Sequence, residues 1–127
     1  MIVLDASPLI AYFDGADALH ERAVASLQRL GGRRLAISPV TLAEVLVGPT
    51  RNGALDVILT GLEILQVEEI GLPDDAAVRL ASLRATTRLR LPDCCILLAA
   101  QQGAAAVLTF DDRLAAVSER LGVPLAT

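Results

Sequence analysis

Short runs of consecutive apolar residues alternate along the chain with longer segments whose apolar residues recur every three or four positions. The short runs are typical of buried strands, and the longer segments are typical of amphipathic helices. The pattern predicts strands at Ile2–Leu4, Leu35–Ile37, Val67–Ile70 and Ala106–Leu108, and a short edge strand at Val123–Leu125. It predicts helices over approximately residues 7–13, 17–30, 38–49, 53–65, 74–88, 92–102 and 111–121.

Most of the expected strands are short and apolar, and helical segments separate them along the chain. This arrangement is typical of a parallel sheet that is covered by helices on both faces, so we predict an α/β fold with a short central parallel sheet. A chain of 127 residues suits one such domain, and no repeat or linker divides it. In an open sheet of this kind, polar residues just past the carboxyl ends of the strands converge on one crevice.

Composition narrows the class of protein. Hydrophobic residues make up 54% of the chain and charged residues 20%, which favours a packed core over disorder. Aromatic residues make up only 2%, which argues against modules that bind RNA by base stacking. The apolar stretches are interrupted well before the roughly 18 residues that a membrane span needs, and no basic signal segment begins the chain. Cys94 and Cys95 are adjacent and fit neither an ordinary disulfide nor a zinc site, so we expect them to be buried, reduced thiols. Together these features predict a soluble cytoplasmic domain.

The charged residues exclude several mechanisms. All 11 basic residues are arginine, and the formal net charge is -4 at pH 7. The absence of lysine excludes chemistry that needs a catalytic amine and sites that need a phosphate-binding lysine. An acidic protein is also a poor non-specific binder of nucleic acid, because its charge repels phosphate. Any nucleic-acid function therefore needs local compensation of this charge.

Four carboxylates stand where the crevice at the carboxyl edge of the sheet is expected. Asp5 follows the first strand, Asp111 follows the strand that ends near Leu108, and Asp93 begins a helix. Glu44 lies inside a helix on a mostly apolar face, where an ionised side chain without a partner is costly. A metal ion shared with the other acids is one answer. Oxygen ligands without His or Cys suit Mg²⁺ or Mn²⁺, and two such ions could activate a water in phosphodiester hydrolysis.

Each acid also has a structural alternative. Asp5 could end a strand in a turn, and Asp93 could serve only as a helix cap. Asp111 and Asp112 could both be first-turn residues that the helix dipole favours. Glu44 could belong to a structural ion pair. Spacing alone therefore leaves both the metal site and these simpler roles open.

A metal site would also remove the objection raised by the net charge. The four acids carry four negative charges, which equals the formal net charge of -4 of the whole chain. Two divalent ions would neutralise them and leave arginines free to hold RNA phosphates. The hydroxyls of Ser7 and Thr109 could orient a carboxylate or a bound water, although capping and turn roles explain them equally well. His20 lies among polar residues and is expected on the surface.

Four segments together resemble the motifs of PIN-domain ribonucleases, specifically the VapC type of bacterial toxin. They are IVLDASPLIA (residues 2–11), ISPVTLAEVLVG (37–48), LRLPDCCILLAA (89–100) and VLTFDDRL (107–114). The resemblance covers essentially the whole chain in the family's order. It identifies as site residues Asp5 with Ser7, then Glu44, then Asp93, then Thr109 with Asp111, and it leaves open whether Asp112 is a further metal ligand. One departure is the Cys94–Cys95 pair, where the family more often has alanine after the acid, and this bears on packing rather than chemistry.

The resemblance implies one PIN domain over residues 1–127, an α/β/α three-layer sandwich and a dependence on Mg²⁺ or Mn²⁺. It also implies endonucleolytic cleavage of structured RNA such as tRNA or rRNA. A cognate VapB-type antitoxin would hold a homodimer inactive, with its tail in the acidic groove. Arg51, Arg84, Arg88 and Arg90 are candidates for contacts with RNA phosphates, and ordinary solvated arginines are an equal alternative.

Other functions share parts of this pattern. A phosphotransfer domain, such as a receiver or a haloacid-dehalogenase-like phosphatase, also places acids at strand ends. The absence of lysine, and Asp5-Ala6-Ser7 in place of Asp-x-Asp, argue against it. A PIN nuclease that is not a toxin would carry the same catalytic residues. A non-catalytic PIN-like module would bind RNA or a partner without cleavage, and the retention of all four acids argues against it.

Overall fold

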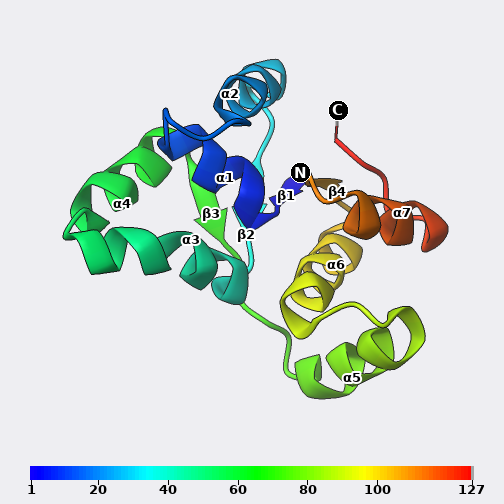
Figure 1. The fold of residues 1–127 in the computed structure, drawn as a ribbon. Coiled ribbons are helices and arrows are strands. Elements are labelled where there is room, and N and C mark those ends of the chain that lie inside the picture. The colour runs from blue at the N-terminus through cyan, green and yellow to red at the C-terminus, as the bar shows by residue number, and fades with distance from the viewer. Residues whose placement is uncertain (127) are drawn as a thin grey trace.

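A computed structural model describes residues 1–126 of the chain. Within that range four strands form one sheet in the order β3-β2-β1-β4, and every neighbouring pair is parallel. The strands are β1 (Ile2–Leu4), β2 (Leu35–Ile37), β3 (Val67–Glu69) and β4 (Ala106–Leu108). The helices in the same range, labelled in Figure 1, are α1 (Ala6–Phe13), α2 (His20–Arg29), α3 (Pro39–Asn52), α4 (Leu55–Ile64), α5 (Ala76–Thr87), α6 (Leu91–Gly103) and α7 (Asp112–Arg120).

Helices cover both faces of the sheet except at the edge strand β3, where Glu68 and Glu69 are exposed. Successive side chains of a strand point to opposite faces, so each covered strand contributes to the packing on both sides. On β1, Ile2 and Leu4 pack into a hydrophobic cluster with residues of α1, α2, α3 and α4. Val3, between them, packs into a second cluster with residues of α5, α6 and α7. Figure 1 shows these two groups of helices on opposite sides of the strands. The predicted α/β/α three-layer sandwich with a short central parallel sheet is confirmed.

Helix α6 forms the centre of the second layer. Its residues Cys94–Ala100 are all buried, and the helix packs against β1 and β4. The expectation that Cys94 and Cys95 are buried is confirmed, since they are 0% and 3% exposed. Burial raises the pKa of both thiols, which keeps them protonated at neutral pH. No helix within residues 1–126 is both long and apolar enough to cross a membrane.

Helix α2 begins later than the sequence pattern predicts. It starts at His20 rather than at about residue 17, because Asp17 Oδ1 accepts a hydrogen bond from Leu19 N (2.8 Å) and stabilises a turn before the helix. His20 is partly buried, and the expectation of a surface histidine is wrong. Its Nδ1 lies 2.8 Å from the carbonyl oxygen of Ala11, so the imidazole joins α2 to α1.

Two further boundaries differ from the expected ones. Helix α3 continues three residues past Pro49 and ends at Asn52; the next residue, Gly53, caps it with a φ of 72°, a conformation that suits glycine. The expected edge strand at Val123–Leu125 is reduced to a single parallel bridge to Val107. Pro124 accepts a hydrogen bond from Val107 N (2.9 Å) but has no N–H to donate, which limits the pairing.

Candidate active site

A pocket of about 300 Å³ opens at the carboxyl edge of the sheet. Four carboxylates from separate segments line it: Asp5 after β1, Glu44 within α3, Asp93 in the first turn of α6, and Asp111 after β4. We name it the acidic pocket. Its other lining residues are Ala6, Ser7, Ile10, Leu19, Arg90 and Phe110. The structure therefore brings together the four acids that the sequence placed at this crevice.

Asp5 is held by hydrogen bonds to both of its carboxylate oxygens. The residue is only 9% exposed. Its Oδ1 accepts a hydrogen bond from Ala6 N (2.7 Å), which caps α1, and its Oδ2 accepts one from Thr109 Oγ1 (2.6 Å). The same Thr109 oxygen accepts a hydrogen bond from Asp111 N (3.0 Å). Thr109 therefore links the segments that carry two of the acids and fixes the orientation of Asp5.

Asp93 and Asp111 both lie at helix N-termini. Asp93 is in the first turn of α6, and Asp111 is the residue before α7. Asp111 Oδ1 accepts hydrogen bonds from Arg113 N (2.8 Å) and Leu114 N (3.1 Å). Free N–H groups and the helix dipole stabilise a carboxylate at such a position. Asp111 therefore both caps α7 and lines the acidic pocket, so the two interpretations of this residue are compatible.

Glu44 is exposed, contrary to the expectation that it lies on an apolar face. Thr41 and Val45 carry the buried side of α3, so Glu44 faces the acidic pocket instead. The pKa of Glu44 is raised above its ordinary value, first by partial desolvation and then by the negative charges of Asp5 and Asp93. The positive charge of Arg90, in the segment before α6, opposes this rise in pKa. The structural ion pair considered for Glu44 is therefore not formed with a residue of α3 itself.

Asp93 is in the same electrostatic situation. Desolvation raises its pKa, and the charges of Asp5 and Asp111 raise it further. Arg90 and Arg113 act in the opposite direction, but the pKa of Asp93 remains above its ordinary value. The acidic pocket thus carries more negative charge than its arginines offset, and an added cation would be attracted to it.

The donor set of the acidic pocket fits a hard divalent cation, since it consists of carboxylate and hydroxyl oxygens. Ser7 Oγ is buried there and has no hydrogen-bond partner among residues 1–126. In the same range, no three His, Cys, Asp or Glu side chains lie close enough to hold a metal ion as they stand. Hydrogen bonds from backbone N–H groups at the starts of α1 and α7 fix the carboxylates of Asp5 and Asp111. Coordination would therefore need movement of the less restrained Glu44 and Asp93 side chains.

Of the four arginines considered for phosphate contacts, Arg90 is the one that lines the acidic pocket. Arg51 is exposed in the last turn of α3. Arg84 Nη1 donates a hydrogen bond (2.7 Å) to a carbonyl of the loop between α5 and α6. The carbonyl of Arg88 in that loop accepts one from Arg113 Nη2 (3.1 Å). These bonds support the loop that carries Arg90.

A second cavity of about 230 Å³ adjoins the acidic pocket and shares Phe110 and Asp111 with it. Arg22 and Arg29 of α2 line it, so we name it the arginine cavity. Asp112 lines the arginine cavity and, unlike Asp111, is not part of the acidic pocket. Sequence reasoning did not identify Phe110 or Arg22 as neighbours of the site. The Arg22 guanidinium lies 4.2 Å from the centre of the Phe110 ring, a contact between distant segments that no local spacing reveals.

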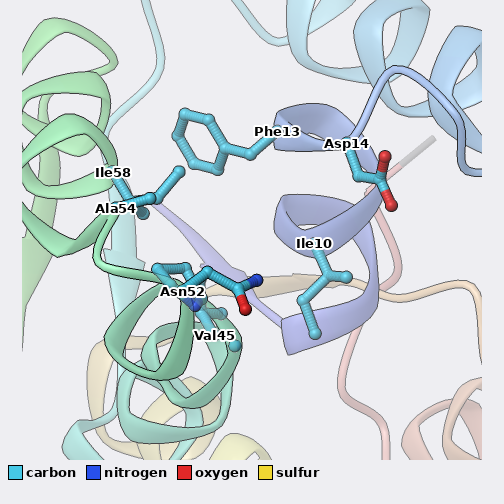
Figure 2. Close-up of a pocket in the computed structure, with 9 residues that line it drawn as sticks. Ile10, Phe13, Asp14, Val45, Asn52, Ala54 and Ile58 are labelled. Carbon is cyan, nitrogen blue, oxygen red and sulfur yellow. The ribbon is translucent and has the colours of Figure 1, made fainter.

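An apolar groove of about 400 Å³ lies between α1, α3 and the start of α4. In Figure 2, Phe13 extends from α1 toward Ala54 and Ile58, and Asn52 extends from the end of α3 toward the space beside Ile10. Ile10 also lines the acidic pocket. The apolar groove and the acidic pocket are therefore neighbouring hollows on the surface.

Solved structures with a similar fold provide an independent comparison. A toxin–antitoxin complex from Klebsiella pneumoniae is 28% identical, with a TM-score of 0.75 and 87% of each chain covered. VapC20 from Mycobacterium tuberculosis, described as a Sarcin-Ricin loop cleaving toxin, is 16% identical, with a TM-score of 0.76 over 92% of this chain and 95% of that one. VapBC2 from Rickettsia felis, bound to a DNA fragment from its promoter, is 18% identical, with a TM-score of 0.72 over 98% and 97% of the two chains.

Sequence comparison gives two results. No curated protein sequence matches the chain significantly. The PIN domain family, in contrast, matches residues 2–120, which is nearly the whole chain and includes all four acids of the acidic pocket. The resemblance found in the four motifs is therefore confirmed, and the chain belongs to the PIN domain family.

Proposed function

We propose that this chain is a VapC-type toxin, an endoribonuclease whose acidic pocket binds Mg²⁺ or Mn²⁺. The observation that carries the proposal is the gathering of carboxylates from four separate segments in one pocket. Caps and turns alone do not require this arrangement, and the raised pKa values of Glu44 and Asp93 show that it costs stability. Membership in the PIN domain family, whose nucleases use divalent metal ions, supports the proposal.

In this proposal the ligands are Asp5, Glu44, Asp93 and Asp111, and Asp112 is an additional carboxylate at the edge of the site. When bound, the ions would supply activation of a water for attack on the phosphodiester and stabilisation of the leaving oxygen. Neutralisation of the acids also removes the repulsion that would keep RNA phosphates out of the pocket.

Other residues of the site position the reactants. Thr109 holds the Asp5 carboxylate in one orientation through its 2.6 Å hydrogen bond. Ser7 lines the acidic pocket, its buried hydroxyl has no hydrogen-bond partner among residues 1–126, and it orients a carboxylate or a bound water. Arg90 lies among the acids and contacts the phosphate that is cleaved. Three arginines farther from the pocket are proposed to contact flanking phosphates: Arg51, Arg84 and Arg88.

The proposed substrate is a structured RNA such as a tRNA or rRNA. Support comes from the resemblance of the motifs to VapC toxins and from the similar fold of VapC20, which is described as a Sarcin-Ricin loop cleaving toxin. A folded RNA presents its backbone in a defined shape, which a small rigid protein can recognise through phosphates and a few exposed bases.

The proposed partners are a second copy of the chain and a VapB-type antitoxin. The K. pneumoniae structure is a toxin–antitoxin complex, and its similarity to this chain supports a partner of that kind. The acidic pocket attracts a basic segment, and the apolar groove beside it can receive apolar side chains of the same segment. We therefore propose that an antitoxin segment with basic and apolar residues covers both hollows and excludes RNA.

Cleavage by the purified protein tests the proposed activity. The wild type, incubated with total bacterial RNA and Mg²⁺ or Mn²⁺, should produce discrete fragments that disappear when the ions are chelated. Asp5→Asn and Asp93→Asn should each abolish cleavage and keep the wild-type far-ultraviolet circular dichroism. Asp74→Asn is the matched control, since Asp74 is exposed and outside the acidic pocket. Retained cleavage in both pocket variants would refute the assigned mechanism.

The two alternatives give different outcomes in the same experiments. Metal-dependent cleavage without growth arrest on expression would indicate a PIN nuclease that is not a toxin. RNA or partner binding without cleavage or Mn²⁺ binding would indicate a non-catalytic PIN-like module. The PIN domain match leaves the phosphotransfer alternative without support.

A further inference from the structure

Phe110 occupies the wall between the acidic pocket and the arginine cavity. It lines both hollows, and Arg22 lines the arginine cavity on the far side of that wall. The Arg22 guanidinium lies 4.2 Å from the ring centre, so one side of the ring is covered by a planar cation. Phe110 also lines the acidic pocket, together with the carboxylates that define the proposed site of cleavage.

The backbone on both sides of Phe110 is firmly held. The preceding residue, Thr109, donates its hydroxyl hydrogen to Asp5 (2.6 Å). The following residue, Asp111, donates its N–H to Thr109 Oγ1 (3.0 Å) and caps α7 with its side chain. The ring is thus carried on a short segment with few remaining conformations. A ligand that packs against it meets a pre-organised surface and loses little entropy to order it.

All three aromatic side chains of residues 1–126 pack against the first hydrophobic cluster. Tyr12 and Phe13 lie on α1 with their rings edge to face and 5.1 Å apart, and neither of them lines the acidic pocket. Within residues 1–126, Phe110 is therefore the aromatic residue placed at the acidic pocket. Its side chain packs at the edge of that cluster and is only partly buried, so part of it remains open to solvent.

We propose that Phe110, backed by Arg22, is a stacking platform for the base of an RNA nucleotide next to the phosphodiester that is cleaved. The inference rests on the proposed ribonuclease function and adds a base-binding subsite to it. A nucleobase is a flat π-system that stacks on an aromatic face, and the acidic pocket places the neighbouring phosphate at the metal ligands. The Arg22 guanidinium over the ring adds cation–π stabilisation.

Phe110→Leu and Phe110→Trp separate stacking from simple packing. Leucine keeps an apolar side chain of similar size without a π face, and tryptophan enlarges the π face. Asp93→Asn serves as the background, because it blocks cleavage and removes one of the negative charges that repel RNA phosphates, so that equilibrium binding can be measured. The probes are fluorescein-labelled RNA decamers with mixed bases and a decamer of the same ribose-phosphate backbone without bases.

Phe110→Leu should weaken binding of the base-bearing decamer by roughly five-fold to a hundred-fold and leave binding of the abasic decamer unchanged. Phe110→Trp should retain the affinity. Because the chain has no tryptophan of its own, the new fluorophore should report directly, with quenching by the base-bearing decamer only. Arg22→Gln should lower the ratio between the affinities for the base-bearing and the abasic decamer by about two- to five-fold. Arg29→Gln, in the same cavity but without the ring contact, is the matched control.

Each outcome bears on one claim. Equal effects of Phe110→Leu on the two decamers, or no effect on either, would overturn the stacking platform while wild-type cleavage leaves the ribonuclease proposal standing. Loss of binding to a co-purified protein partner, with RNA binding unchanged, would assign Phe110 to a protein interface and also overturn the platform. Absence of any metal-dependent cleavage by the wild type would remove the proposed function and this inference together.

Discussion

Replacement of Thr109 by valine removes one hydrogen bond and changes the packing very little. Thr109 Oγ1 donates to Asp5 Oδ2 at 2.6 Å, and Asp5 is only 9% exposed, so water cannot fully replace the lost donor. A hydrogen bond to a charged group contributes about 1.5–3 kcal/mol. Asp111 N loses its acceptor too, but it is exposed and can bond to water. We expect Thr109→Val to lower the free energy of unfolding by about 2 kcal/mol, or the melting temperature by roughly 5–10 °C.

Urea unfolding at neutral pH, with divalent ions chelated, measures this loss. Thr109→Ser should restore most of the stability because it restores the hydroxyl. Thr86→Val is the control, since Thr86 is exposed and bonds only to carbonyls of its own helix, and it should change stability by less than about 0.5 kcal/mol. In an Asp5→Ala background the cost of Thr109→Val should fall by about 1.5 kcal/mol. An unchanged cost in that background would refute the argument that Thr109 acts through Asp5.

Three further predictions follow from the same structure. Because folding raises the pKa of Asp93, the unfolded state binds fewer protons, and the stability of the protein falls as the pH rises through that pKa. Asp93→Asn should therefore have a higher melting temperature than the metal-free wild type at neutral pH. In thermal unfolding this difference should vanish below about pH 4, where the carboxyl of Asp93 is protonated in the unfolded state too. Mg²⁺ or Mn²⁺ at about ten times its dissociation constant should stabilise the wild type by about 1.4 kcal/mol in the same assay and have no such effect on Asp93→Asn. Gly48→Ala, within α3 and in open space, should stabilise by about 0.5–1 kcal/mol, whereas Gly53→Ala, at φ 72°, should destabilise by about 1 kcal/mol in urea unfolding.

The three-layer fold could be predicted because it depends on local patterns. Ile2–Leu4 and Ala106–Leu108 are continuously apolar, as strands buried on both faces must be, and the helices between the strands leave parallel pairing as the simplest arrangement. The placement of Asp5 and Asp111 followed from the same reasoning, since parallel strands end at one edge. Local patterns predicted the ends of helices less well; Asp17, for example, forms a turn before α2 instead of beginning that helix.

The environment of individual site residues could not be predicted in the same way. Glu44 has mostly apolar neighbours on its own helix, but its side chain faces acids contributed by β1 and α6. Low aromatic content argued against base stacking, yet one aromatic residue, Phe110, lies at the acidic pocket under Arg22. Both results depend on contacts between segments that are distant in the chain, and composition and spacing carry no information about such contacts.

The central claim is that the acidic pocket cleaves specific RNA bonds, and sequencing of new RNA 5′ ends tests it most directly. Wild type, Asp5→Asn and the exposed control Asp74→Asn would each be expressed briefly at matched levels in a bacterial host. We predict discrete new 5′ ends and growth arrest with the wild type and Asp74→Asn, and neither with Asp5→Asn. The same new ends in Asp5→Asn as in the wild type would contradict the claim that these carboxylates carry out the cleavage.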